Sequence, residues 1–181
     1  MSDTEETIEL RAPEADDVAA LSRFAARVPA HDLLFLQRDI RESRVLEAWL
    51  RAEEAGEAQS LIAVAGGQLV GTIAAIRDSL SWSPHVADIR LLVAPEWRNR
   101  GLGRRLLQRA IKAACQAGAT KLTARMTPDQ TGAITLFEEC GFRAEALLRD
   151  QVRDADGELH DLAVLAMDPA REQALHAAFE G

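Results

Sequence analysis

The sequence predicts a mixed α/β fold in which helices cover a single sheet. Two observations support this fold class. Segments with helical spacing of apolar residues alternate with short apolar runs of strand length along the whole chain. Glycine and proline stand at most of the junctions between these segments, and there is no internal repeat and no long polar linker. At 181 residues, the chain 1–181 is therefore expected to form one domain with a sizeable core.

The first third of the chain predicts one strand and two helices. Residues 8–11 form a short apolar strand. Pro13 then precedes an amphipathic helix that ends before Pro29, since proline is tolerated at a helix start and not inside it. A second helix is predicted over residues 42–55. Residues 30–39, between the two helices, are too apolar for a free linker and too irregular to assign.

The middle third predicts a hairpin, a further strand and a long helix. Residues 60–65 and 69–76 flank Gly66-Gly67, a strong signal for a two-residue turn. Residues 86–94 form the next strand. Residues 101–117 then carry apolar side chains on one face and basic side chains on the other, which is typical of a surface helix.

The last third adds a strand, a helix, a hairpin and a terminal helix. Residues 120–126 are rich in apolar and β-branched side chains and predict a strand. Residues 130–140 form a short helix, and residues 142–152 and 159–167 form a hairpin around an Asp-Gly turn. Residues 170–179 follow an Asp-Pro pair that suits a helix start.

Charge is distributed unevenly along the chain. The net charge is −8, yet residues 97–128 contain no acidic residue and eight basic ones. The other 13 basic residues are outnumbered by 29 acidic residues. An acidic protein with one basic patch disfavours general nucleic-acid binding and favours a small phosphorylated ligand. The alternative is that these basic residues only form the solvated face of a helix.

Several other classes of protein are disfavoured. The first residues are acidic and polar, and no apolar run approaches the ~20 residues of a membrane span, so a cytoplasmic protein without a membrane partner is expected. Cys115 and Cys140 are too few for a disulfide framework and are interpreted as core thiols. The four histidines lack metal-ligand spacing, so no metal is expected, and no nucleophile elbow is present. The sequence is compatible with a homodimer.

One motif joins the strand at residues 86–94 to the helix that follows. Arg98, Gly101 and Gly103 have the spacing R-x-x-G-x-G. The first amides of a helix lack internal partners and its dipole favours negative charge, so this junction suits a pyrophosphate. Glycine lets that ligand approach the backbone closely. The glycine order differs from a dinucleotide-binding motif, and the lysine of a Walker loop is absent. The alternative is that the glycines only form a tight turn.

With two further features, the motif resembles the acyl-CoA-dependent acyltransferases of the GNAT superfamily. The first is the Leu91-x-Val93-x-Pro95 strand before the motif, and the second is the later helix that ends in Gly141-Phe142. The order of elements is also similar over nearly the whole chain. The resemblance implies a mostly antiparallel sheet with a splayed central strand pair, flanked by helices. It also implies acetyl-CoA as co-substrate.

The resemblance further implies an N-acetyltransferase that acetylates a primary amine, in a small molecule or a peptide, by direct attack in a ternary complex. Two alternatives remain at this point: a non-catalytic acyl-CoA sensor of the same fold, and a binder of another nucleotide. The backbone at two strand positions, Leu91 and Val93, is expected to polarise the thioester. Residues expected to contact the cofactor are Leu91, Val93, Arg98, Asn99, Arg100, Gly101, Leu102, Gly103, Arg104, Gln130, Ala133 and Phe137.

The sequence departs from the family pattern at the reacting groups. The tyrosine that often protonates the leaving thiolate is replaced by Phe137, and the chain has no tyrosine. Gln130 stands where many members have asparagine. Many members carry a glutamate that acts as general base on this strand, and the corresponding position here is Ala87. The adjacent Asp88 is therefore the candidate general base. Strand alternation instead favours an ion pair between Asp88 and Arg90, and a water relay is the other alternative.

Acceptor-site residues are the least defined. Trp82 and His85 in the loop before the strand, and His160 on the last hairpin, are candidates for contact with the amine. The alternative, which the sequence favours for both histidines, is that each is a packing or half-exposed structural residue. In similar proteins the region around Asp32 and Asp39 covers the acceptor site.

Overall fold

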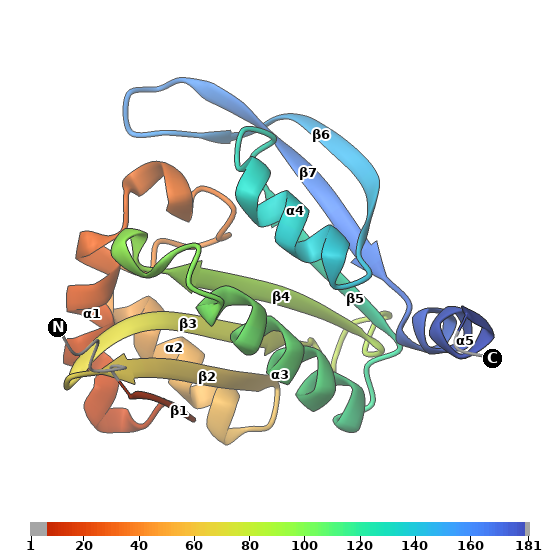
Figure 1. Ribbon diagram of the computed structural model, residues 1–181. Helices are drawn as coiled ribbons and strands as arrows, with labels where there is room; N and C mark the ends of the chain where they lie inside the picture. Colours follow the sequence, from red (N-terminus) through yellow and green to blue (C-terminus); the bar gives the residue numbers. More distant parts are fainter. Residues whose placement is uncertain (1–6, 180–181) are drawn as a thin grey trace, which may run out of the picture.

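The structure, a computed structural model, describes residues 7–179 (Figure 1). It contains a seven-stranded mixed sheet with the order β1-β2-β3-β4-β5-β7-β6. Every neighbouring pair is antiparallel except β4 and β5. The strands are β1 (Ile8–Arg11), β2 (Ala58–Ala65), β3 (Gln68–Ile76), β4 (Val86–Val93), β5 (Lys121–Met126), β6 (Arg143–Arg153) and β7 (Leu159–Met167).

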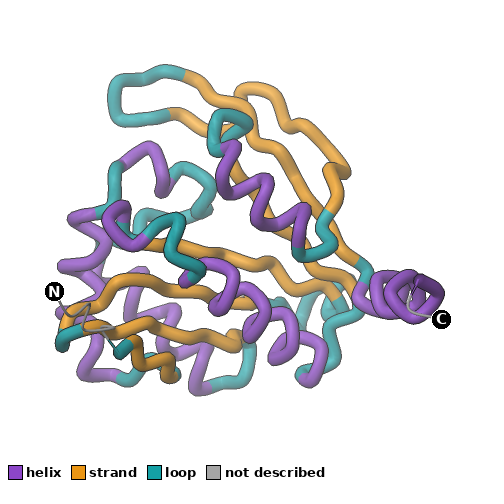
Figure 2. The backbone as a smooth tube through the Cα atoms, in the orientation of Figure 1, coloured by secondary structure: helices purple, strands orange, loops and turns teal. Residues whose placement is uncertain are grey.

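Five α-helices flank this sheet in the described residues (Figure 2). α3 covers one face of β2, β3 and β4, and α1 and α2 lie behind the same strands (Figure 1). Two short 3-10 helices, η2 (Ala30–Leu33) and η3 (Pro95–Trp97), lie beside the site described below. No described helix combines the length and apolar content of a membrane span. The helices are α1 (Val18–Arg27), α2 (Ser43–Glu54), α3 (Leu102–Gln116), α4 (Thr131–Glu139) and α5 (Pro169–Phe179).

The packing of the core accounts for the helical spacing of apolar residues in the sequence. Leu102, Leu106 and Leu107 of α3 are fully buried and follow helical spacing, so one face of the helix packs on the sheet. Strand β3 is buried at seven consecutive positions because helices cover both of its faces. The predicted fold class, a mixed α/β sheet of mostly antiparallel strands, is confirmed.

The splay predicted for the central strands is also present. β4 pairs with β5 from Val86 opposite Lys121 to Ile89 opposite Ala124, and the register stops there although both strands continue. The Ala94 amide donates to the Val70 carbonyl on the β3 side. Because backbone groups alternate along a strand, those of Leu91 and Val93 point to the opposite side, toward the gap.

The differences from the predicted elements are at their ends. β2 begins at Ala58, two residues earlier than predicted, because it pairs with β3 over the whole length of that strand. α4 begins at Thr131 and β5 at Lys121, each one residue later than predicted. The unassigned residues 30–39 open with the 3-10 helix η2, whose Leu33 is buried.

Candidate active site

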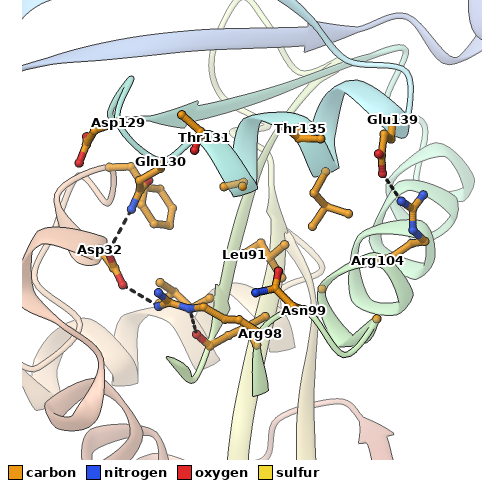
Figure 3. A pocket seen from close by; sticks show the side chains of 18 of the residues that line it. Asp32, Leu91, Arg98, Asn99, Arg104, Asp129, Gln130, Thr131, Thr135 and Glu139 are labelled. Carbon is orange, nitrogen blue, oxygen red and sulfur yellow. Dashed lines mark hydrogen bonds and ion pairs between the residues drawn. The ribbon is translucent and has the colours of Figure 1, made fainter. Parts of the chain in front are cut away.

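A cavity of about 900 Å³ lies where the gap between β4 and β5 opens (Figure 3). Its walls come from η2 and the residues after it, the end of β4, the loop before α3 with the first turn of that helix, and one face of α4 as far as Glu139. These segments are far apart in the sequence and meet because β4 and β5 are neighbours in the sheet. The volume is in the range of small-molecule and cofactor sites.

The loop between β4 and α3 presents unpaired amides to this cavity. Asn99 and Gly101 have positive φ angles of 58° and 78°, which turn the chain sharply into α3. Arg105 is the first residue of the helix whose amide bonds back to the loop, at 3.1 Å from the Gly101 carbonyl. Within the described part of the chain, the amides of residues 99–104 have no backbone acceptor. This junction is therefore a socket for an anion.

Space beside the socket is limited by the next helix. A Cβ atom at Gly103 would lie 3.1 Å from Leu136 of α4 and within 4 Å of Leu91 and Val93. Glycine at this position lets the two helices and the splayed strand approach one another. The close approach of α4 thus limits the space on one side of the socket, and the residues that line the cavity fit a phosphorylated cofactor.

The arginines of the loop are partly neutralised by acids that lie far away in the sequence. Arg98 donates from Nε to the Val93 carbonyl at 3.1 Å and forms an ion pair with Asp32 at 2.6 Å. Arg104 pairs with Glu139 of α4 (Figure 3). The basic patch that the sequence predicted is thus bordered by carboxylates, which corrects its apparent isolation from acidic residues.

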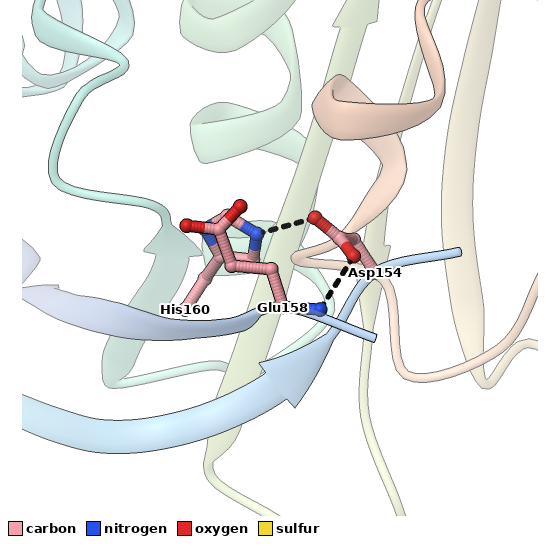
Figure 4. Close-up of side chains that lie close together, drawn as sticks. All are labelled: Asp154, Glu158 and His160. Carbon is pink, nitrogen blue, oxygen red and sulfur yellow. Dashed lines mark hydrogen bonds and ion pairs between the residues drawn. The ribbon is translucent and has the colours of Figure 1, made fainter. Parts of the chain in front are cut away.

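Two histidines meet at the η2 wall of the cavity, which His31 forms. His31 Nε2 lies 2.8 Å from Asp129 Oδ2, and the ring stacks edge-to-face on His160 with centroids 5.2 Å apart. His160 Nε2 lies 2.7 Å from Asp154 Oδ2 (Figure 4). The hydrogen bond to Asp154 raises the pKa of His160, and hydrogen bonds from Thr127 and then His31 lower the pKa of Asp129.

The group in Figure 4 has metal-binding residue types, with ligand atoms of Asp154, Glu158 and His160 within 4.8 Å of one another. The hairpin turn already accounts for this arrangement. Asp154 Oδ1 accepts the amides of Asp156 and Glu158, while Oδ2 faces His160. This is an Asx-type turn with a histidine as its third partner.

Most of the predicted cofactor residues meet at the cavity. Three do not line it. Leu102 is fully buried below the loop, Arg100 lies over the Trp97 ring at 4.2 Å, and Phe137 is 3% exposed. Phe137 packs edge-to-face on Phe142 and borders a small adjoining cavity. The predicted residues that line the main cavity are Leu91, Val93, Arg98, Asn99, Gly101, Gly103, Arg104, Gln130 and Ala133.

The candidate general base lies outside the cavity lining. The Asp88 carboxylate is 3.0 Å from Arg90 Nε and accepts the Thr123 hydroxyl at 3.3 Å, so the ion pair favoured by strand alternation is present. Trp82 and His85 lie in an exposed loop that does not line the cavity either. The roles suggested for these residues stay predictions.

Other residues at the site had no signal in the sequence. His31, Asp129 and Glu139 line the cavity, but each is an ordinary polar residue in its own segment. The packing of η2 against the start of α4 reveals His31 and Asp129, and the pairing of Glu139 with Arg104 of α3 reveals Glu139. The two cysteines are half-buried, and burial raises the pKa of both thiols, as expected of core residues.

An anion socket of unpaired amides beside a splayed parallel strand pair is the arrangement that the resemblance implied for the acyl-CoA-dependent acyltransferases. The profile of the Acetyltransferase (GNAT) family matches residues 25–142, which is more than half of the chain. The chain belongs to this family and is an acetyl-CoA-dependent N-acetyltransferase. A comparison with curated protein sequences finds no match.

Solved structures share the fold at low sequence identity. yncA of Salmonella typhimurium, solved with its cofactor acetyl-CoA, is 20% identical with a TM-score of 0.76, over 90% of this chain and 94% of that one. A ribosomal-protein-alanine N-acetyltransferase of Brucella melitensis is 21% identical with a TM-score of 0.75, over 88% and 99%. Spermidine N-acetyltransferase of Vibrio cholerae, in complex with CoA and spermine, is 18% identical with a TM-score of 0.73, over 90% and 96%.

Proposed function

We propose that the chain is a single N-acetyltransferase domain that transfers an acetyl group from acetyl-CoA to a primary amine by direct attack in a ternary complex. The observation that carries this proposal is the shared cavity. Four residues whose amides lack a backbone acceptor line the same cavity as Leu91 and Val93 of the splayed strand, and they are Asn99, Gly101, Gly103 and Arg104. One elongated ligand can therefore reach both.

The loop before α3 holds the pyrophosphate in this proposal. Its amides donate to the phosphate oxygens, and the positive end of the α3 dipole favours their charge. Arg98, fixed by the Val93 carbonyl and Asp32, shapes the loop between β4 and α3. Gln130 and Ala133 at the start of α4 border the path from this loop to the gap.

The backbone of β4 positions the thioester. Leu91 and Val93 point their backbone groups into the gap that β5 leaves open, so an extended pantetheine arm can pair with them. One of these amides then donates to the thioester oxygen, where negative charge develops as the amine attacks. At Val93 the carbonyl already accepts a hydrogen bond from Arg98 Nε, so the amide is the backbone group that is free for the ligand.

No enzyme acid is required for the departing thiolate. Phe137 occupies the place of the family tyrosine and packs into the core beside Phe142. A thiol has a pKa of about 8.5, so the thiolate is a fair leaving group that water can protonate. Phe137 acts in this proposal as an apolar wall near the end of the pantetheine arm.

The acceptor is proposed to be a cationic amine. Asp129 lines the cavity, and the carboxylates of Asp154 and Glu158 lie close to His160 beyond it. These acids attract an ammonium group. Two of the structural neighbours are named for amine acceptors, spermidine and the alanine of a ribosomal protein.

Release of free CoA thiol tests the proposal. The protein is incubated with acetyl-CoA and, separately, with spermidine, lysine, and a peptide that begins with alanine. We expect amine-dependent thiol release with at least one of them, and the acetylated product by mass spectrometry. Acetyl-CoA binding without thiol release for any amine would contradict the proposal and favour a non-catalytic sensor.

A further inference from the structure

The cavity wall at η2 carries a histidine that none of the roles above uses. His31 lines the cavity and its side chain is 36% exposed. Its Nε2 lies 2.8 Å from Asp129 Oδ2 and 3.3 Å from the Thr127 hydroxyl. The ring is thus held at one edge by groups that follow β5, and it remains reachable from the cavity.

These contacts define which ring nitrogen can accept a proton. The hydrogen bonds of Asp129 keep its pKa low, so it is a carboxylate at neutral pH and can only accept. The Nε2 of neutral His31 therefore carries the proton and donates it to Asp129. The lone pair then sits on Nδ1, for which the described residues provide no hydrogen-bond partner. This is the arrangement of a base oriented by a carboxylate.

The charged and titratable groups that face His31 come from two further elements. Asp129 belongs to the turn between β5 and α4, and His160 of β7 contacts the ring edge-to-face at 77°. Behind His160 lie Asp154 and Glu158 of the hairpin turn. Because His160 is itself bonded to Asp154, it limits rotation of the His31 ring.

The remaining carboxylates near the gap are already engaged. Asp32, next to His31 in the chain, is paired with Arg98. Asp88 is paired with Arg90 and lies outside the cavity lining. His31 is the side chain in the lining that combines an available proton acceptor with an orienting partner.

We infer that His31 is the general base of the acetyl transfer and that Asp129 is its positioning residue. The inference rests on the proposed function. Nδ1 of His31 accepts one proton from the acceptor ammonium, and the freed nitrogen lone pair forms a bond to the thioester carbonyl carbon. The carbon–sulfur bond then breaks, and its electron pair leaves with the thiolate. The second nitrogen proton goes to that thiolate through water, and His31 returns its proton to solvent.

The test compares pH profiles of kcat/KM for the fastest amine among spermidine, lysine and the alanine peptide. Wild-type protein should show an acidic limb, because the base must be deprotonated to act. His31→Gln should lose about 10²-fold or more at pH 7 and lose this limb, with the KM for acetyl-CoA changed less than about threefold. Added imidazole should restore part of the activity of His31→Ala in proportion to its concentration.

Asp129→Asn tests the positioning role. It should lower kcat by about tenfold, because the His31 ring loses the acceptor that orients it, while the KM for acetyl-CoA changes less than about threefold. Asp156→Asn, at an exposed carboxylate in the hairpin turn, is the matched control and should leave both kinetic constants unchanged.

The outcomes separate the two proposals. If wild-type protein acetylates none of the amines, the proposed function and this inference both fail. If wild-type protein is active and His31→Gln retains the limb and the rate, only the inference is overturned. Loss of the limb in Asp88→Asn but not in His31→Gln would also overturn it and assign the base to Asp88.

Discussion

A negative charge placed at Gly101 should weaken cofactor binding strongly while the protein stays folded. Gly101 has a φ of 78° at the N-terminal end of α3, and a Cβ atom there would meet nothing within 4 Å. An alanine therefore fits sterically and costs only backbone strain, about 1 kcal/mol, or a fall in Tm of about 2–4 °C. A glutamate adds the same strain, and the helix dipole offsets up to about 1 kcal/mol of it.

The effect on the ligand is larger. A carboxylate about 5 Å from the nearest charge of a pyrophosphate repels that charge by about 3 kcal/mol at an effective dielectric constant of ~20. We therefore expect Gly101→Glu to weaken acetyl-CoA binding by about 10²-fold, and Gly101→Ala by less than about tenfold. Isothermal titration calorimetry measures the affinities, and the deficit of the glutamate variant should shrink at high salt.

The hairpin turn offers a matched control. Gly157 also has a positive φ, 87°, a Cβ atom there would likewise meet nothing within 4 Å, and the residue lies outside the cavity lining. Gly157→Glu thus adds the same charge and a similar strain elsewhere, and it should bind acetyl-CoA like wild type. An affinity of Gly101→Glu within threefold of Gly101→Ala would refute the assignment of the pyrophosphate to this loop.

Three further predictions concern stability and titration. Phe137→Ala should lower the free energy of unfolding by about 3–4 kcal/mol in urea melts, because it empties a core position that is 3% exposed; a loss below about 1 kcal/mol would contradict its place in the core. Hydrogen bonds from Arg11 lower the pKa of Asp17. This pair therefore stabilises the folded state fully above pH 3.8, and the stabilisation is lost as pH falls through the lower folded-state pKa. Asp17→Asn should cost about 1–3 kcal/mol at pH 7, and its difference from wild type should shrink below pH 4. The hydrogen bond to Asp154 raises the pKa of His160, so the stability that this pair gives the fold is complete below pH 6.5 and is lost as pH rises through the folded-state pKa. Measured by NMR, the pKa of His160 should lie above 6.5 in wild type and should be lower in Asp154→Asn.

Local chemistry explains how much of the fold was predictable. The buried stripe of α3, the Gly66-Gly67 hairpin and the turn at Gly101 each depend on residues that are neighbours in sequence. The anion socket also depends on neighbouring residues, because a strand, a short glycine-containing loop and a helix suffice to form it. The ends of β2 and α4 were less accurate, since pairing partners and packing set them.

The sequence by itself determined the class of elements and the anion socket, through short-range periodicity and turn chemistry. The tertiary structure alone decided which charges surround that socket. Asp32 reaches Arg98 across 66 residues, and His31 reaches Asp129 across 98. Such contacts depend on the sheet order, which places β4 beside β5, and on the packing of η2 against the start of α4. No local pattern encodes that arrangement, because each side chain is ordinary until its partner is brought within a few ångströms.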